Sequence, residues 1–172
     1  MKTIHWLCMA AFFLPAAAGC SRSMTPGQSG KADPDKAAAV REMLDARNYV
    51  FKAQMVSPSS GRTRHLTSDY DLKVSQDKVE AYLPYFGRAY SAPMDPSKGG
   101  IKFSSSQFTY NTSDRKKGGW LIQIEPKDEK EVQQLTLTVS EAGYATLQVI
   151  STNRQPISFN GIMEAGKETD NP

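Results

Sequence analysis

Residues 70–74 read Tyr-Asp-Leu-Lys-Val, an alternation of bulky apolar and charged side chains. Successive side chains of a β-strand point to opposite faces, so this pattern predicts a strand with one buried and one solvated face. Tyr49, Phe51, Ala53 and Met55 repeat the same two-residue period. The sequence therefore predicts a fold built from half-buried strands.

Similar short apolar runs recur along the rest of the chain. They lie around residues 79–83, 101–103, 108–110, 120–124, 135–139, 145–149 and 157–162. Most of the polar and glycine-containing connections between them are too short for a helical crossover, so consecutive strands are expected to pair antiparallel. We expect a mainly β fold, an antiparallel meander of about eight or nine strands curled into a partly open barrel, with a two-sheet sandwich as the alternative.

One helix is predicted before the first strand. Asp33 supplies an N-cap, and Pro34 occupies the first helical position, where a missing N–H has no cost. Val40, Met43 and Leu44 recur at helical spacing and form one apolar stripe. We expect an N-terminal helix that packs this stripe against the strands.

The first twenty residues have the features of an export signal. Lys2 precedes an apolar run at residues 6–14, and small residues follow up to Cys20. The sequence Ala-Ala-Gly-Cys at 17–20 resembles the lipobox of bacterial lipoproteins, in which the cysteine is lipidated. We expect a lipoprotein signal peptide at 1–19, with ordinary cleavage after Ala18 as the alternative.

The remaining organisation follows from this signal. We expect a lipidated Cys20 and flexible tether at 20–32, a single β-rich domain at 33–165 and a disordered tail at 166–172. In Gram-negative lipoproteins an aspartate directly after the cysteine retains the protein at the inner membrane. By that resemblance, Ser21 indicates a lipid anchor in the outer membrane, with the domain facing the periplasm.

Composition excludes several classes of function. Both cysteines, Cys8 and Cys20, and one of the two histidines lie in the signal region, which leaves the domain with His65 alone. A disulfide framework, a cysteine nucleophile and a zinc site are therefore not expected, and we expect no metal or cofactor. A net charge of +3 is too small to favour nucleic acid as a partner.

An aromatic segment is the most distinctive part of the β region. Residues 82–90 contain four of the 16 aromatic residues of the chain. Pro84 interrupts strand pairing and Gly87 permits a sharp bend, which is typical of a strand that turns at the rim of a sheet.

This segment also carries a family resemblance. Leu-Pro-Tyr-Phe-Gly-Arg-Ala-Tyr at 83–90, Gly-Gly-Ile-Lys-Phe at 99–103 and Ser-Thr-Asn-Arg-Gln-Pro-Ile-Ser-Phe-Asn-Gly at 151–161 closely resemble a family of uncharacterised Gram-negative lipoproteins defined by a domain of unknown function. The resemblance covers roughly residues 40–164. It implies a mostly β fold of lipocalin-like topology behind a lipoprotein signal, and it brings no activity or catalytic residue.

The candidate binding residues are Tyr85, Phe86, Arg88 and Tyr90, with Arg154 joining them from the second motif. Aromatic rings beside a guanidinium suit a sugar or ring that carries an anionic group. The alternative is that the rings fill the core, that Arg88 pairs with a buried carboxylate, and that residues 153–156 form only a turn.

The sequence thus favours a non-enzymatic module that binds a small amphipathic or glycan-like ligand at the membrane. One alternative is an accessory subunit of an envelope complex that recruits a partner strand along a sheet edge. Another is a hydrolase that uses two carboxylates.

Overall fold

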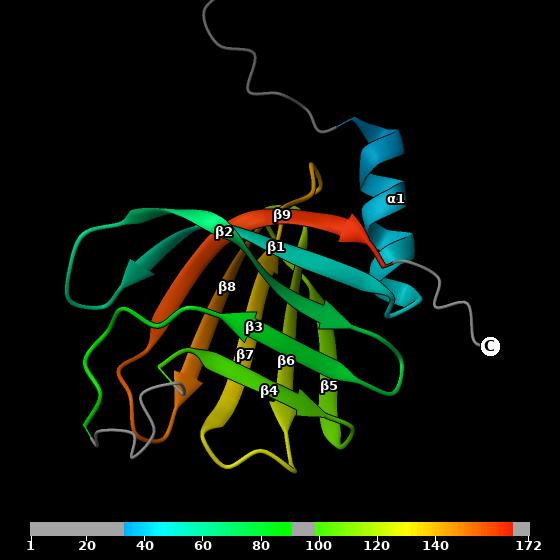
Figure 1. The fold of residues 1–172 in the computed structure, drawn as a ribbon. Helices are drawn as coiled ribbons and strands as arrows, with labels where there is room; N and C mark the ends of the chain where they lie inside the picture. Colours follow the sequence, from blue (N-terminus) through cyan, green and yellow to red (C-terminus); the bar gives the residue numbers. More distant parts are fainter. Residues whose placement is uncertain (1–32, 91–98, 167–172) are drawn as a thin grey trace, which may run out of the picture. The chain divides into compact units, whose positions relative to one another are not determined.

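The computed structural model describes residues 33–90 and 99–166. The expected signal peptide, the lipidated Cys20, the tether up to residue 32 and the tail beyond Gly166 lie outside these residues. The described part contains one helix and nine strands (Figure 1). They are α1 (Pro34–Asp45), β1 (Tyr49–Pro58), β2 (Arg64–Val74), β3 (Val79–Leu83), β4 (Ile101–Ser105), β5 (Phe108–Asp114), β6 (Trp120–Pro126), β7 (Val132–Val139), β8 (Tyr144–Ser151) and β9 (Ile157–Ala165).

The helix begins as the sequence predicts. The side chain of Asp33 accepts a hydrogen bond from the backbone N–H of Asp35 at 3.2 Å, and Pro34 follows the cap. Val40 and Leu44 are buried, which confirms that this stripe faces the strands. The helix therefore buries one apolar face and leaves the other in solvent.

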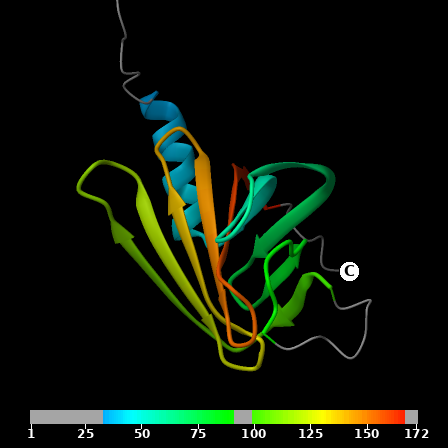
Figure 2. The ribbon, with the colours of Figure 1, turned by 90° about the vertical axis from the view of Figure 1, so that its left-hand side faces the viewer.

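All nine strands belong to one antiparallel sheet with the order β4-β3-β2-β1-β9-β8-β7-β6-β5. Figure 2 shows the sheet curled so that its two halves face each other. The first and last strands, β1 and β9, pair with each other, while β4 and β5 each lack a neighbouring strand on one side within the described residues. The result is a nearly closed barrel, which confirms the predicted mainly β meander and not the two-sheet sandwich.

Strand boundaries differ from the expected runs, most clearly in β2 and β5. β2 begins at Arg64, six residues before the alternation at 70–74. The apolar run around 108–110 is followed by polar residues that read as part of the connection to the next run, yet β5 continues through residues 111–114 and pairs with β6 as far as Asp114 and Trp120. These residues are exposed. An edge strand can place polar side chains on both faces because it is not covered, so it lacks the apolar alternation that identifies a strand in a sequence.

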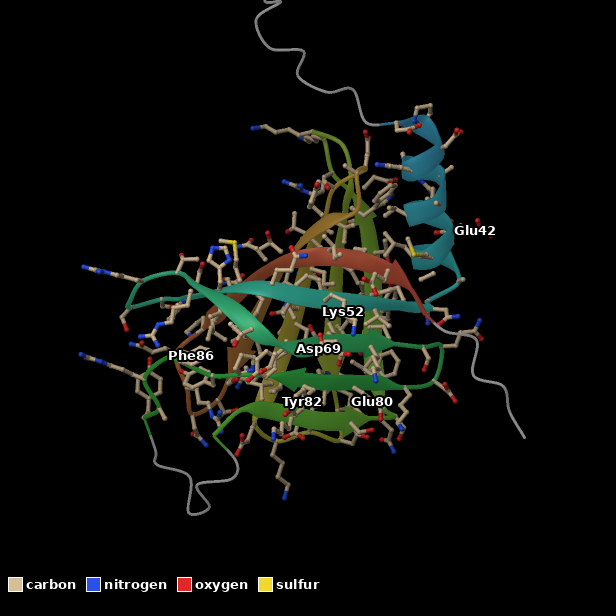
Figure 3. All side chains as sticks on the ribbon, turned by 45° about the horizontal axis from the view of Figure 1, so that its top comes forward. Glu42, Lys52, Asp69, Glu80, Tyr82 and Phe86 are labelled. Atoms are coloured by element: carbon tan, nitrogen blue, oxygen red, sulfur yellow. The ribbon has the colours of Figure 1, made fainter. Side chains whose placement is uncertain are left out.

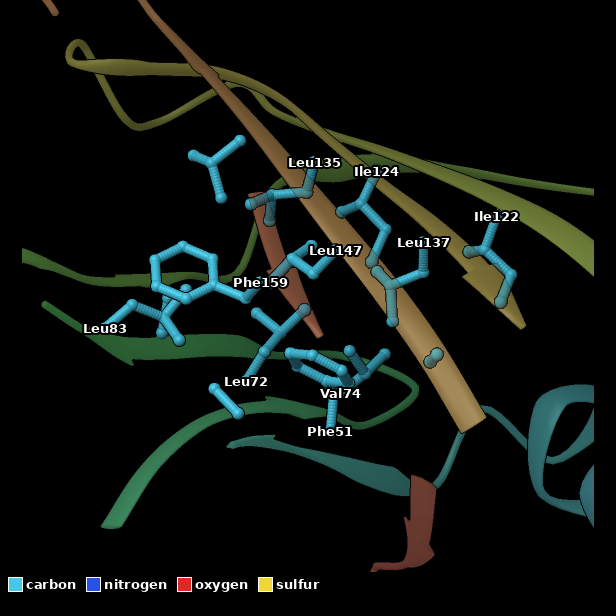
Figure 4. Packing of buried hydrophobic residues seen from close by; sticks show 14 of the residues in the cluster. Phe51, Leu72, Val74, Leu83, Ile122, Ile124, Leu135, Leu137, Leu147 and Phe159 are labelled. Atoms are coloured by element: carbon cyan, nitrogen blue, oxygen red, sulfur yellow. The ribbon is translucent and has the colours of Figure 1, made fainter. Parts of the chain in front are cut away.

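Apolar side chains from both halves of the sheet fill the interior. Figure 4 shows Phe51, Leu72 and Val74 packed in one cluster with Leu147 and Phe159. Phe51, Leu72, Leu147 and Phe159 have no exposed surface. Burial of each large apolar side chain contributes about 1.5–3 kcal/mol. The interior is thus a packed core, as in other small barrels.

The contact between β1 and β9 requires a glycine. Both ladders of β1 shift register between Ala53 and Met55, and Gly161 pairs with Ala53 at this irregularity. A Cβ atom on Gly161 would collide with the carbonyl oxygen of Lys52. The close approach of the two backbones therefore excludes any side chain at residue 161.

We predict that Gly161→Ala lowers the free energy of unfolding by about 2–4 kcal/mol, because the two strands must separate to admit the methyl group. Urea unfolding measures the loss. Ser158→Ala on the same strand is the matched control and should change stability by less than about 0.5 kcal/mol. Equal stability of the two variants would contradict the close approach.

Hydrogen bonds connect the short turn between β4 and β5 to the loop between β6 and β7. Asp128 accepts hydrogen bonds from the Ser105 hydroxyl and, at 3.0 Å, from the backbone N–H of Ser106. The hydrogen bond from Ser105 has the largest effect on the pKa of Asp128, and the one from Ser106 has the next largest. Both lower this pKa below its ordinary value. The ionised carboxylate therefore favours the folded state.

The lowered pKa of Asp128 predicts a specific acid response. A carboxyl group whose pKa is depressed by folding stabilises the protein above its ordinary pKa of about 4, and this contribution is lost as the pH falls through the folded-state pKa. Asp128→Asn should therefore flatten the fall in urea midpoint on acidification below about pH 4. The exposed Asp69→Asn variant should keep the wild-type slope. An unchanged slope in Asp128→Asn would contradict the assignment.

Candidate functional site

Three segments distant in sequence meet at one end of the barrel. They are the tip between β1 and β2, residues 84–90 after β3, and the loop between β8 and β9. The end of β1 meets the start of β9 because Pro58 pairs with Ile157. The Ser60 hydroxyl then donates to the Gln155 side-chain oxygen at 3.0 Å.

Residues 84–90 lie against the β8–β9 loop through backbone hydrogen bonds. Ala89 and Arg154 form an antiparallel bridge. The N–H of Tyr90 donates to the Asn153 carbonyl at 2.8 Å, and the N–H of Gln155 donates to the Arg88 carbonyl at 3.0 Å. The motifs at 83–90 and 151–161 are therefore neighbours, as expected for Arg154 and the aromatic segment. Backbone hydrogen bonds, and not a shared ligand site, hold them together.

The side chain of Arg154 stabilises the contact between residues 84–90 and the β8–β9 loop. Its relative exposure is only 7%. The guanidinium donates to the carbonyl of Gly100 at 3.1 Å and contacts the carboxylate of Glu131 at 3.3 Å. It also lies 5.1 Å from the centre of the Tyr85 ring. Arg154 thus links four parts of the chain, and we call this set of contacts the Arg154 clasp.

Tyr85 completes the clasp. Its hydroxyl lies 2.7 Å from the carbonyl oxygen of Arg88 and 3.1 Å from that of Gln155. A Cβ atom on Gly87 would lie 2.6 Å from this hydroxyl oxygen. The Tyr85 side chain can therefore adopt this position only because residue 87 has no side chain. Burial raises the pKa of Tyr85, which keeps the phenol protonated as a donor.

The other predicted binding residues point outward. Phe86 is 44% exposed, Tyr90 is 72% exposed, and the Arg88 side chain is exposed as well. The Arg64 guanidinium lies 5.4 Å from the centre of the Phe86 ring. We call Arg64, Phe86, Arg88 and Tyr90 the arginine–aromatic surface.

The structure therefore divides the five residues predicted to bind a ligand. Tyr85 and Arg154 belong to the clasp, and Phe86, Arg88 and Tyr90 belong to the surface. The alternative in which Arg88 pairs with a buried carboxylate does not fit an exposed side chain, and it is Arg154 that is buried beside Glu131. Sequence reasoning missed Arg64, whose only signal is its place in the basic run at 62–65.

The arginine–aromatic surface has a defined chemistry. Exposed aromatic rings can stack on a sugar or another flat ring, and guanidinium groups bind carboxylate, sulfate or phosphate through two parallel hydrogen bonds. Arg64 already lies over one ring, so a cation and a ring face are presented together. The clasp beneath holds the backbone that carries these groups.

The described residues form two depressions, one beside the Arg154 clasp and one at the other end of β1. A small one of about 10 Å³ is lined by Arg154 and Glu131, and it has room for about one water molecule. A larger one of about 560 Å³ lies at the other end of β1, where Tyr49 and Val50 line it. Figure 3 shows Phe86 at one end of the region around β1, β2 and β3. Glu80, which lines the larger cavity, lies toward the other end of that region.

Residues 33–90 and 99–166 contain neither a metal-ligand cluster nor a helix suited to crossing a membrane. No group of three or more histidine, cysteine, aspartate or glutamate side chains in these ranges could hold a metal ion. In the same ranges, no helix combines the length and hydropathy needed to cross a membrane.

Comparison with known proteins gives two findings. The DUF4251 family, described as a domain of unknown function, matches residues 31–163. The chain is also similar to the crystal structure of a DUF4251 family protein from Bacteroides eggerthii, with a TM-score of 0.57 and 18% identity over 78% of this chain and 90% of that chain. A search of curated proteins found no match.

The clasp predicts opposite outcomes for two arginines. Arg154→Ala removes a buried cation and leaves the Gly100 carbonyl without its donor, so the free energy of unfolding should fall by about 2–4 kcal/mol. Arg88→Ala removes an exposed side chain and should cost less than about 0.5 kcal/mol. Urea unfolding of both variants measures the difference. A stable Arg154→Ala protein would show that the clasp does not hold the motifs.

Proposed function

The chain belongs to the DUF4251 family, and we propose that it is a lipid-anchored cell-envelope protein that binds a glycan-like ligand without catalysis. The anchor is a lipid on Cys20, and the β unit faces the periplasm from the outer membrane. The features that support the anchor are the signal at residues 1–19 and the cysteine behind small residues, and Ser21 directly after the cysteine supports the outer membrane as its location.

The arginine–aromatic surface is the observation that carries the binding function. Phe86 and Tyr90 expose ring surface, and Arg88 and Arg64 lie on the same end of the barrel. A ligand that satisfies these groups has a sugar ring for stacking and an anionic group for a guanidinium. The ligand class is therefore an acidic oligosaccharide.

Rigidity beneath the surface supports a binding role. The backbone of residues 88–90 is hydrogen-bonded to the β8–β9 loop, and Arg154 and Tyr85 hold that loop from below. A surface whose backbone is already ordered loses less entropy when a ligand binds.

An accessory subunit is the second candidate. The free edges of β4 and β5 in the described sheet favour it, because an unpaired edge can accept a partner strand. However, six of the seven side chains of β5 are polar or aromatic-polar, and most are exposed. The long apolar edge that a strand-recruiting subunit requires is not found at β5.

Nothing observed favours the hydrolase. Asp71 and Glu80 line the larger cavity, but Asp71 contacts Lys52 and Glu80 contacts Lys78. These two carboxylates are thus paired with lysines, whereas acid hydrolysis of a glycosidic bond uses two carboxyl groups that flank the substrate.

Binding of a trigalacturonate probe tests the charge requirement, with neutral maltotriose as the comparison ligand. We predict that Arg88→Ala weakens trigalacturonate binding about tenfold, the loss expected for one charged hydrogen-bonding group, and leaves the melting temperature unchanged. Arg115→Ala, an exposed arginine on the β5–β6 turn, is the matched control and should bind like wild type. Equal binding of trigalacturonate and maltotriose would contradict the proposal.

Phe86→Ala tests the stacking requirement by the same titration. Loss of one stacked ring should weaken trigalacturonate binding about five- to tenfold. Tyr144, a tyrosine on β8 that is 66% exposed, provides the control because it lies outside the surface. If Tyr144→Ala weakens binding as much as Phe86→Ala does, the ligand does not bind at the arginine–aromatic surface.

A further inference from the structure

A second binding site lies at the other end of β1. We propose that the cavity between the start of β1, the end of β2 and the end of β9 binds a small zwitterion, an ammonium and a carboxylate joined by a short aliphatic chain. This inference does not rest on the proposed function, because none of the residues of the arginine–aromatic surface lines the cavity.

The cavity has the size of a small-molecule site. Its volume is about 560 Å³, which lies within the range of about 300–1,000 Å³ typical of ligand pockets. Val50, which is half-buried, supplies apolar surface, and charged side chains from four strands and the β2–β3 turn surround it. An apolar floor with charged groups around it suits an amphipathic ligand.

Two of the lysines in this cavity already have acidic partners. The ammonium of Lys52 lies 3.1 Å from the carboxylate of Asp71, whose side chain is only 15% exposed. The ammonium of Lys78 lies 2.7 Å from the carboxylate of Glu80. These pairs neutralise their own charges and leave little capacity for a ligand.

Among the charged residues on the strands that line the cavity, Lys73 and Glu164 remain available. Both line the cavity and both are exposed, and neither forms an ion pair with any of residues 33–90 or 99–166. Glu80 pairs with Lys73 in strand register, but its carboxylate is held by Lys78. Asp77 on the β2–β3 turn also lines the cavity, and its carboxylate accepts a hydrogen bond from the Ser75 hydroxyl at 3.2 Å. On its strands, the cavity thus offers one unpaired cation and one unpaired anion to a ligand.

Sheet register places these two charges on either side of an apolar residue. Val50 pairs with Lys73 on β2 and with Glu164 on β9, so the three residues form one row across the strands. Two strand spacings separate the Cα atoms of Lys73 and Glu164 by about 10 Å. Their side chains therefore flank Val50 with opposite charges.

This row determines the ligand chemistry. A carboxylate on the ligand would face the Lys73 ammonium, an ammonium would face Glu164, and methylene groups between them would cover Val50. A ligand with a single charge can satisfy only one side of the row. Each further charge pair at an exposed site adds only a modest gain, so the preference for a zwitterion is measurable but limited.

The test compares three probes of matched length: 6-aminohexanoate, hexanoate and hexylammonium. Each is titrated by calorimetry into the full chain kept in detergent, and the heat of titration into detergent alone is subtracted. We expect 6-aminohexanoate to bind about fivefold more tightly than either singly charged probe.

Charge-neutral variants assign the two ends of the ligand. Lys73→Gln should bind 6-aminohexanoate no better than hexylammonium, and Glu164→Gln should bind it no better than hexanoate. Lys102→Gln on β4 and Glu125→Gln on β6 carry the same changes outside the cavity and should bind all three probes as wild type does. An unchanged melting temperature shows that each variant is folded.

Three results would overturn the proposal. They are the absence of saturable heat with 6-aminohexanoate at millimolar concentration, equal affinity for the zwitterion and a singly charged probe, and a loss of binding in the Lys102→Gln or Glu125→Gln controls that matches the loss in the cavity variants. None of these results bears on trigalacturonate binding at the other end of β1, so the two binding sites are tested separately.

Discussion

The pairing of β1 with β9 is the constraint on which both candidate sites depend. It joins the first and last strands of the meander and runs along the whole length of β1 (Figure 1). At one end, Pro58 meets Ile157 and brings the β8–β9 loop to residues 84–90. At the other end, Tyr49 meets Ala165 and places Glu164 beside Val50, on the side of β1 opposite to β2. One long-range ladder therefore builds two different surfaces.

The clasp explains why the two motifs contain the residue types they do. An arginine that is nearly fully buried needs acceptors, and Arg154 finds them in the Gly100 carbonyl and Glu131. Tyr85 contributes its ring to the guanidinium and its hydroxyl to the backbone, and Gly87 leaves space for it. These residues have a structural role. Because they hold the backbone in place, the side chains of Phe86, Arg88 and Tyr90 remain exposed to solvent.

Local patterns were sufficient to predict the elements of the fold. The two-residue period at 70–74 and the Asp33-Pro34 cap identify β2 and α1 because both signals depend only on neighbouring residues. The β1–β9 ladder could not be read in this way, since it joins segments about a hundred residues apart whose register depends on Gly161. The polar half of β5 was missed because an edge strand needs no buried face.

The candidate sites were harder to predict for the same reason. Arginine is usually exposed, so nothing in the sequence near Arg154 indicates a buried clasp with Glu131. Lys73 and Glu164 each look like the solvated face of an ordinary strand. Only the register through Val50 shows that they flank one apolar surface. The proposed binding sites therefore depend on strand pairing more than on local motifs.

Native mass spectrometry of the full-length protein, purified from its own envelope, tests most directly whether this barrel is a ligand-binding module. The account predicts a chain that carries a lipid on Cys20 and retains a small acidic carbohydrate, which Arg88→Ala protein from the same envelope retains to a lesser extent. A chain that retains a second protein subunit and no small molecule would contradict it and favour the accessory subunit.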